Sequence, residues 1–260
     1  MTEQAVIDQQ VRHLLFEIRE QTVSDVGASF QVAEKTSYKD LVTTVDKRNE
    51  QWLDRRLKEI DPGCRIISEE GFGDHVADLG GHVWVVDPLD GTMNFVMQQH
   101  RYAIMVGLFI DGQPTTGYIM DVDTATLYHG GPQGGVFLQT PTTNTRLQSP
   151  VDKHLHDSLV SVNSMMILKG EHNLRQVALA ARGLRMYGSA GLEITDVLTG
   201  RLGAYISWLK PWDAAAGRIM AAALNLTFVK IDGTPADVLS SNSVLIATNN
   251  AAREILQLVK

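Results

Sequence analysis

The stretch WVVDPLDGTMNF at residues 84–95 decides how the rest of the chain can be interpreted. It continues a β-branched and aromatic run that begins at Val83 and is typical of a buried strand. The run then breaks into Asp-Pro and Asp-Gly-Thr, a turn sequence after which a second element can begin. The sequence therefore predicts that two carboxylates, Asp87 and Asp90, stand three residues apart at the end of a strand.

The residues between and after these carboxylates suit the binding of a charged ligand. Pro88 stiffens the backbone because its ring fixes φ. Gly91 has no side chain, so the amides of Gly91 and Thr92 can approach an anion closely. Carboxylates that can hold a hard cation, next to amides that can hold an oxyanion, favour metal-assisted phosphate chemistry. Taken alone, however, Asp-Pro-x-Asp-Gly is more often a purely structural turn.

Two further motifs favour a metal and phosphate site over a purely structural turn. One is Ser68-Glu69-Glu70-Gly71, after the apolar pair Ile66-Ile67, and the other is KPWDAAAG at residues 210–217, which opens an Ala-rich helical run. Each has an ordinary explanation by itself, since an acidic pair is usually a solvated turn and an aspartate near a helix start is usually a cap. Their combination with the first motif, in this order along the chain, is more specific.

Together the three motifs resemble the inositol monophosphatase family of magnesium-dependent, lithium-sensitive phosphatases. The family pattern Asp-Pro-(Leu/Ile)-Asp-Gly-Thr-x-Asn-Phe is complete at residues 87–95, and Trp-Asp-x-Ala-Ala-Gly is complete at residues 212–217. The resemblance implies a mixed α/β fold, the layered αβαβα sandwich of inositol monophosphatase and fructose-1,6-bisphosphatase. It also implies a metal site between two halves. We expect these halves at residues 1–143, with most of the motifs, and 144–260, with Asp213 and a wall of the substrate pocket.

The resemblance further implies a ligand set for about two or three Mg²⁺ ions. Glu69, Asp87 and the carbonyl of Leu89 would hold one ion. Asp87, Asp90 and Asp213 would hold a second, with Asp87 bridging the two. Clustering these carboxylates without a cation raises their mutual repulsion and their proton affinity, so we expect the site to bind metal readily.

The catalytic residues implied by the same motifs are Asp46, Glu69 and Thr92. The Thr92 hydroxyl would contact the attacking water, with Asp46 or Glu69 as the proton acceptor. Asp46 has an alternative role as a first-turn carboxylate favoured by the helix dipole, because a helix is expected from about Thr44 to Ile60. Lys35 has the ordinary role of a surface lysine, or, by the resemblance, a position near the metal site.

The resemblance also implies residues that contact the substrate. They are Asp90, Gly91, Thr92, Gly188, Ser189, Ala190 and Ile206. Inositol-cleaving members carry a glutamate seven residues before the Trp-Asp aspartate, where it contacts the sugar hydroxyls, and counting back from Asp213 gives Ile206. An isoleucine cannot accept a hydrogen bond from a hydroxyl, so we expect a specificity broader than, or different from, that for myo-inositol phosphate. Trp208 and Lys210 would suit a flatter or more anionic substrate.

The rest of the chain alternates between predicted helices and strands in the way that indicates α/β layering. Besides Thr44–Ile60, we expect helices at 2–26, 171–182, 212–224 and 250–258, and one that residues 188–191 open and that carries Leu192 to Leu198. We expect four strands of an antiparallel meander at 102–110, 115–120, 125–129 and 135–139. Later strands are expected at 159–162, 184–187, 204–206, 226–231 and 244–247. We expect a loop or hairpin at 27–38 and a polar junction at 141–157.

Composition excludes several classes of function. The net charge of −7 argues against non-specific binding of nucleic acid, and no basic cluster offsets it. No apolar run reaches the roughly 20 residues of a membrane span. Cys64 is the only cysteine, which excludes an internal disulfide and a cysteine-based zinc site. We therefore expect a cytoplasmic protein without nucleic-acid or membrane partners, and, by analogy with the family, a homodimer.

These inferences lead to a Mg²⁺-dependent phosphomonoesterase, a phosphoric monoester hydrolase that uses metal-activated water. The expected partner is a small phosphorylated metabolite, which could be an inositol-like, sugar or nucleotide phosphate. The alternative is a non-catalytic module on the same fold that binds a phosphorylated ligand or has a regulatory role. Such a module would be expected to have lost a metal ligand, and none of the family positions is missing here.

Overall fold

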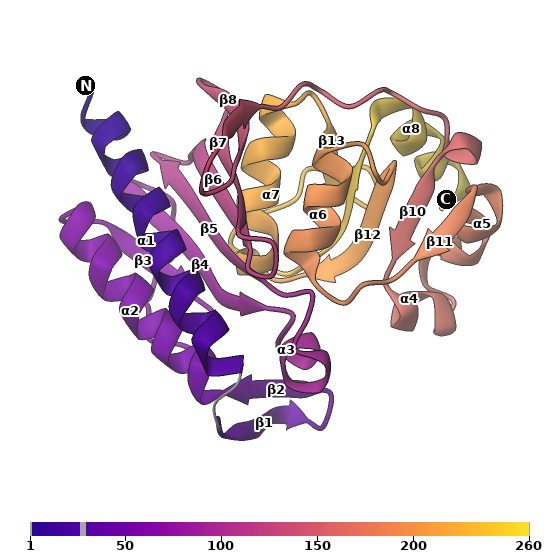
Figure 1. The fold of residues 1–260 in the computed structure, drawn as a ribbon. Helices are drawn as coiled ribbons and strands as arrows, with labels where there is room; N and C mark the ends of the chain where they lie inside the picture. The colour runs from indigo at the N-terminus through magenta and orange to yellow at the C-terminus, as the bar shows by residue number, and fades with distance from the viewer. Residues whose placement is uncertain (1, 27–29, 260) are drawn as a thin grey trace.

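The computed structural model describes residues 2–26 and 30–259, arranged as five layers (Figure 1). The first layer consists of α1 (Glu3–Val26) and α2 (Thr44–Ile60). The buried side chains of α1 recur every three or four residues from Ile7 to Ile18, which is the spacing of one face of a helix. This face packs on the first sheet together with Leu53 and Leu57 of α2.

The second layer is a seven-stranded sheet in the order β3-β4-β5-β6-β7-β8-β9. Its strands are β3 (Arg65–Ser68), β4 (His82–Asp90), β5 (Ala103–Ile110), β6 (Gln113–Asp121), β7 (Thr126–Gly131), β8 (Gly135–Gln139) and β9 (Asn144–Arg146). β3 runs parallel to β4, and all other neighbours are antiparallel. The antiparallel meander is confirmed. β9 was not expected, because the exposed residues 144–146 have no apolar alternation that would indicate a strand.

The middle layer consists of α6 (Ala190–Leu198) and α7 (Pro211–Ala223), which lie between the two sheets (Figure 1). α7 approaches the first sheet closely at a pair of glycines. Gly107 of β5 and Gly117 of β6 are directly paired across the two strands. A Cβ added at Gly117 would lie 2.5 Å from the carbonyl oxygen of Ala216 in α7. The missing side chains therefore set how closely α7 approaches the sheet, and with it the position of the α7 N-terminus.

The fourth layer is a five-stranded sheet in the order β11-β10-β12-β14-β13. Its strands are β10 (Leu159–Val162), β11 (Gly183–Arg185), β12 (Ala204–Leu209), β13 (Thr227–Lys230) and β14 (Asn242–Ala247). The outer helices α4 (Ser164–Leu168), α5 (Leu174–Ala180) and α8 (Asn249–Leu258) form the fifth layer. The single helix expected at 171–182 is instead two pieces, because His172 and Asn173 adopt a left-handed backbone that interrupts it.

The expected irregular segment 27–38 falls partly on residues 27–29, which lie outside the described residues. Its remainder enters a hairpin of β1 (Val32–Ser37) and β2 (Asp40–Thr43), separate from the main sheets. β4 also differs from expectation, since it continues beyond Val86 through Asp-Pro-Leu-Asp to Asp90. Its pairing with β5 becomes irregular between Asp87 and Asp90, so the turn predicted there is a distortion within a strand. α3 (Thr92–Gln98) follows directly.

These layers form a mixed α/β fold with the αβαβα order expected from the sequence. The expected division after residue 143 stays a prediction, although the chain passes from the first sheet to the second between Arg146 and Leu159. In the described part of the chain, no helix combines the length and the apolar character needed to cross a membrane.

The contact between α7 and the glycine pair can be tested by substitution. We expect Gly117→Ala to lower the free energy of unfolding by about 1–3 kcal/mol, the usual cost of overpacking, because the new methyl group meets the α7 backbone. Gly134→Ala is the matched control, since a Cβ there meets no atom within 4 Å. Chemical denaturation of both variants measures the effect. Equal stability of the two variants would show that the glycine pair does not limit the approach of α7.

Candidate active site

The irregular end of β4 carries two buried carboxylates. Asp87 is 1% exposed and Asp90 is 8% exposed. The Leu89 amide donates a hydrogen bond to Asp87 Oδ1 at 3.1 Å, so the carboxylate is held against its own turn. Gly91 follows with φ +88°, a left-handed conformation that favours glycine, and α3 begins at the next residue. The motif thus places two acidic side chains and the start of a helix within a few residues.

Asp90 joins this turn to the middle layer. Its carboxylate accepts hydrogen bonds from the Ser189 hydroxyl at 2.5 Å, the Ala190 amide at 3.0 Å and the Gly191 amide at 2.7 Å. These donors lie at the N-terminus of α6, where unpaired amides and the helix dipole favour a negative charge. Burial nevertheless raises the pKa of Asp90 to about 6, against the opposing effect of these hydrogen bonds.

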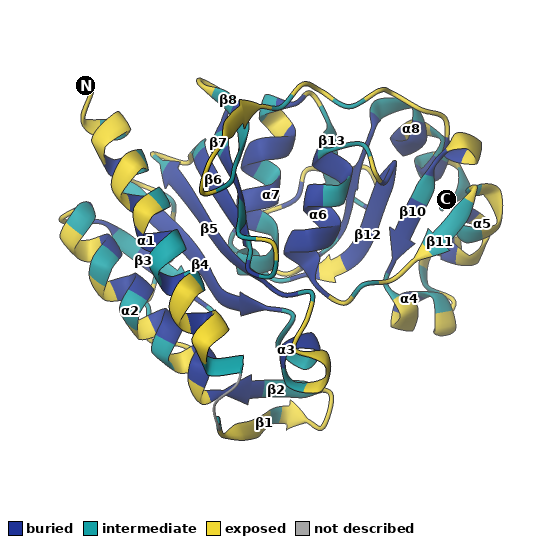
Figure 2. Cartoon of the chain, viewed as in Figure 1, coloured by how far each residue is buried: buried dark blue, intermediate teal, exposed yellow. Residues whose placement is uncertain are grey.

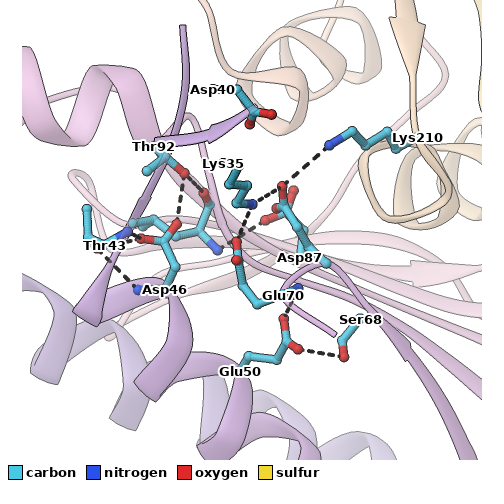
Figure 3. A network of polar contacts seen from close by, with 12 residues as sticks. Lys35, Asp40, Thr43, Asp46, Glu50, Ser68, Glu70, Asp87, Thr92 and Lys210 are labelled. Carbon is cyan, nitrogen blue, oxygen red and sulfur yellow. Dashed lines mark hydrogen bonds and ion pairs between the residues drawn. The ribbon is translucent and has the colours of Figure 1, made fainter. Parts of the chain in front are cut away.

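Glu69 lies in the loop after β3, next to a lysine of the β1–β2 hairpin. Lys35 Nζ is 2.9 Å from Glu69 Oε1 and 2.5 Å from Glu70 Oε1 (Figure 3). Lys210 Nζ approaches Glu69 Oε1 from the other side at 3.9 Å. Burial disfavours the charged form of Lys35, but the two glutamates outweigh it and keep the pKa of Lys35 above its usual value. Of the two roles left open for Lys35, the structure supports a position at the acidic site.

Asp213 stands in the first turn of α7, as the Trp-Asp motif predicts. Its Oδ2 accepts the Lys210 amide at 2.8 Å, so the carboxylate caps the helix. Burial and the nearby charge of Asp90 raise the pKa of Asp213 to about 7. A carboxylate that only caps a helix is best hydrated at the surface, so the half-buried position of Asp213 beside another carboxylate indicates an additional role.

Asp46 and Thr92 form a pair close to these carboxylates. The Thr92 hydroxyl lies 2.8 Å from Asp46 Oδ1 and 3.1 Å from the Leu89 carbonyl oxygen (Figure 3). The other carboxylate oxygen of Asp46 accepts the Thr43 amide at 2.8 Å in a capping box at the start of α2. Asp46 is therefore both a first-turn cap and a hydrogen-bond partner of Thr92, and its role as a proton acceptor stays a prediction.

The carboxylates have the chemistry of a site for a hard cation. Burial raises the pKa of Asp87 well above its usual range, and the charges of Glu69, Asp90 and Asp213 raise it further. Oxygen-only donors of this kind suit Mg²⁺. Within residues 2–26 and 30–259, no three Asp, Glu, His or Cys side chains are already arranged as a metal cluster. In this structure Asp90 is directed to α6 and Glu69 to Lys35, so the donor set fits Mg²⁺ in chemistry and needs side-chain adjustment to surround it.

A cavity of about 270 Å³ opens next to Asp90 and Asp213. Its lining includes the expected substrate residues Gly188, Ser189 and Ala190. Sequence reasoning had not connected Glu193 or Tyr205 with this cavity, although both line it. Glu193 is buried and accepts hydrogen bonds from the Ser161 hydroxyl and the Tyr187 amide, so it fixes the segment before Gly188.

The structure corrects the expectation for Ile206. Its side chain is fully buried in the core between the second sheet and the outer helices, so it does not line the cavity. Neighbouring residues of a strand point to opposite faces, and Tyr205 and Ser207, on either side of Ile206, both line the cavity. Counting seven residues back from Asp213 therefore selects the wrong face of β12. Ser207 accepts a hydrogen bond from Asn163 Nδ2 at 3.2 Å. It presents a short hydroxyl to the cavity instead of the glutamate carboxylate of inositol-cleaving family members.

A buried glutamate on α2 supports the Glu69 loop, and the motif analysis missed it. The Glu50 carboxylate accepts hydrogen bonds from the Ser68 hydroxyl at 2.9 Å and from the Glu70 amide at 2.6 Å (Figure 3). It also accepts one from the Phe72 amide at 2.8 Å. Glu50 is fully buried, so these donors replace its lost hydration. The available signal was its place four residues after Asp46, which puts both on one face of α2.

Because Glu50 holds the Glu69 loop by hydrogen bonds, we expect that weakening these bonds lowers the affinity for metal. In Glu50→Gln one carboxylate oxygen becomes an amide N–H₂ group, which cannot accept the backbone or hydroxyl protons now directed at it. We expect the affinity for Mg²⁺ to fall roughly 10- to 100-fold, as for other residues that orient metal ligands, with faster amide hydrogen exchange at residues 68–72.

Titration calorimetry with Mg²⁺ measures the affinity, and Glu59→Gln, an exposed change on the same helix, is the control. Unchanged affinity in Glu50→Gln, with the fold intact by circular dichroism, would contradict the positioning role of Glu50.

Comparisons with known proteins identify the family of this chain. Residues 3–260 match the sequence model of the Inositol monophosphatase family. An inositol-1-monophosphatase of Bacillus subtilis (strain 168) is 34% identical over 99% of this chain and 97% of its own length. A crystal structure of an IMPase/NADP phosphatase with Mg²⁺ and phosphate has a TM-score of 0.89, at 27% identity over 99% of this chain and 96% of that one. A lithium-soaked inhibitory complex of staphylococcal inositol monophosphatase-1 has a TM-score of 0.90, at 27% identity over 99% and 95% of the two chains.

The family expected from the motifs and the layered fold thus agree with matches over nearly the whole chain. The chain belongs to the inositol monophosphatase family and is an inositol monophosphatase-like phosphomonoesterase.

Proposed function

We propose that this phosphomonoesterase depends on Mg²⁺ and hydrolyses a small phosphorylated metabolite. The observation that carries the proposal is the convergence of Glu69, Asp87, Asp90 and Asp213, of which Asp87 and Asp90 are buried and the other two half-buried, so closely that their charges act on one another. They come from the loop after β3, the end of β4 and the start of α7. The cost of burying them is high unless a cation is bound, so the arrangement favours a metal site over a structural one.

The residues assigned to hold Mg²⁺ are Glu69, Asp87, Asp90, Asp213 and the Leu89 carbonyl. When bound, Mg²⁺ neutralises phosphate oxygens and lowers the pKa of a water molecule. The protein itself has to hold the phosphate, orient the water and accept its proton. The Thr92 hydroxyl, 2.8 Å from Asp46 Oδ1, can accept a hydrogen bond from the water and relay the proton toward that carboxylate. The amides of Gly91 and Thr92, at the start of α3, are assigned to the phosphate oxygens.

The relatives narrow the substrate to a class. One solved relative binds Mg²⁺ and phosphate and is described as an IMPase/NADP phosphatase, and another is crystallised with D-inositol-1-phosphate. We infer that inositol phosphate is a substrate here, and that lithium inhibits this enzyme as it does the staphylococcal relative. A non-catalytic phosphate-binding module is disfavoured because the acidic set is complete and Asp46 contacts Thr92. The homodimer and the cellular location expected from the sequence stay predictions.

Metal dependence tests the proposed function. We expect the purified protein to release inorganic phosphate from inositol 1-phosphate with Mg²⁺, to lose this activity on chelation and to regain it when Mg²⁺ is restored. Asp213→Asn should lower kcat by roughly two orders of magnitude, as for other lost electrostatic contacts to a transition state. Asp78→Asn, at an exposed carboxylate, is the control. Full activity at a confirmed metal content of nil would refute the metal dependence, and normal turnover of Asp213→Asn would refute its role as a ligand.

Two neighbouring residues of β12 test which face selects the substrate. We expect Ser207→Glu to raise the preference for inositol phosphate over glycerol 2-phosphate by about 1–3 kcal/mol, because the new carboxylate can accept hydrogen bonds from ring hydroxyls. Ile206→Glu should instead destabilise the fold, because it buries a charge in the core. Specificity constants for both substrates, with thermal unfolding, separate these outcomes. A gain in inositol preference from Ile206→Glu would show that the assignment of faces is wrong.

A further inference from the structure

β12 carries an exposed tryptophan between two cavities. Trp208 is 57% exposed, whereas the other residues of β12 are buried. It lines the cavity at the acidic site and also a second cavity of about 520 Å³ over α4. Figure 2 shows exposed surface at the end of β12, next to the buried body of the strand. An indole ring in this place offers a flat apolar surface to whatever occupies the cavities.

The two cavities are neighbours around this ring. Both are lined by Asn163 as well as Trp208, so a molecule whose phosphate lies beside Asp90 and Asp213 can extend past Trp208 into the second cavity. Asn163 is fixed in place, because its side-chain oxygen accepts the amides of Met165 and Met166 at the start of α4. The second cavity is therefore a continuation of the phosphate site rather than a separate surface feature.

Other exposed apolar side chains gather at the same place. Met165 is 42% exposed and lines the second cavity, and Met186 is 52% exposed and lines the first. A single exposed apolar residue needs no explanation, but a group around a cavity next to an active site does. The charged residues here are balanced, since Lys169 lies 3.8 Å from Glu171. This balance favours an uncharged planar group over a second anion.

We propose that Trp208, with Met165 and Met186, forms a stacking subsite for a planar ring on the leaving group, so that nucleoside phosphates are preferred substrates. The inference rests on the proposed function, because the phosphate has to be held by the acidic site. The stacking surface accepts different bases, since every base has a π-face and stacking needs no particular hydrogen-bond pattern. The short Ser207 hydroxyl, which lines the same cavity as Trp208, leaves room for a sugar without demanding a hydroxyl pattern.

The test compares AMP with ribose 5-phosphate, which carry the same phosphate ester and differ in the base. We expect the unmodified enzyme to have the higher kcat/KM for AMP. Trp208→Ala should lower the ratio of the two specificity constants by roughly tenfold or more, and Trp208→Phe should retain most of it. Leu179→Ala, at an exposed apolar residue of α5, is the control. Adenosine should quench the tryptophan fluorescence of the unmodified protein, ribose should not, and Trp208→Ala should abolish the response.

The outcomes separate the two proposals. Suppose that inositol phosphate is hydrolysed. If Trp208→Ala then leaves the ratio of kcat/KM for AMP to that for ribose 5-phosphate unchanged, the subsite is refuted while the phosphatase proposal stands. The same holds if neither AMP nor ribose 5-phosphate is a substrate. If no phosphate ester is hydrolysed, the proposed function fails and adenosine quenching decides the subsite. If sedimentation shows that Trp208→Ala converts a dimer into monomers, a second copy of the chain covers this face and the subsite is refuted.

Discussion

The contact between Asp90 and the N-terminus of α6 is the interaction on which the site depends. One carboxylate at the end of β4 accepts a hydroxyl and two amides from Ser189, Ala190 and Gly191, about 100 residues further along the chain. These bonds are charge-assisted and buried, so they are stronger than bonds at the surface. They fix the start of α6 beside the Asp-Pro-Leu-Asp-Gly-Thr motif of residues 87–92. Because α6 and α7 pack together in the middle layer, they also help set where Asp213 stands.

The same burial that makes this contact strong makes the site electrostatically unfavourable. Asp87, Asp90 and Asp213 all have raised pKa values because burial disfavours their charged forms, and the charges of neighbouring carboxylates add to the effect. Lys35 and Lys210 supply positive charge near Glu69, at the edge of the group. A fold with several acidic residues in one water-poor place is less stable than the same fold with neutral residues there. Such a loss of stability is typical of sites whose residues are kept for their chemistry.

The sequence predicts contacts between residues that are close along the chain better than contacts between residues that are far apart along it. The spacing within residues 87–92 is local, so the turn, its two carboxylates and Thr92 could be anticipated from the motif. Glu50 could not, since its partners Glu70 and Phe72 are about 20 residues away and are recognised only once α2 lies under the loop. The prediction that Ile206 contacts the substrate was wrong for a different reason. Counting residues back from a motif does not determine the face of a strand, because one residue of difference moves a side chain from cavity to core.

In the proposed function, the residues of β12 select the substrate and the acidic residues on other elements carry out the reaction. The proposed metal ligands and the Thr92–Asp46 pair lie on the loop after β3 and on β4, α2, α3 and α7, and the close packing at Gly107 and Gly117 sets how near α7 lies to the first sheet. On β12, Tyr205 and Ser207 face the cavity, Ile206 faces the core, and Trp208 ends the strand between two cavities. A substitution at Ser207 or Trp208 alters the surface offered to the leaving group without touching a carboxylate. Specificity in such a site can change while the reaction is retained, because the residues that select the alcohol do not hold the phosphate.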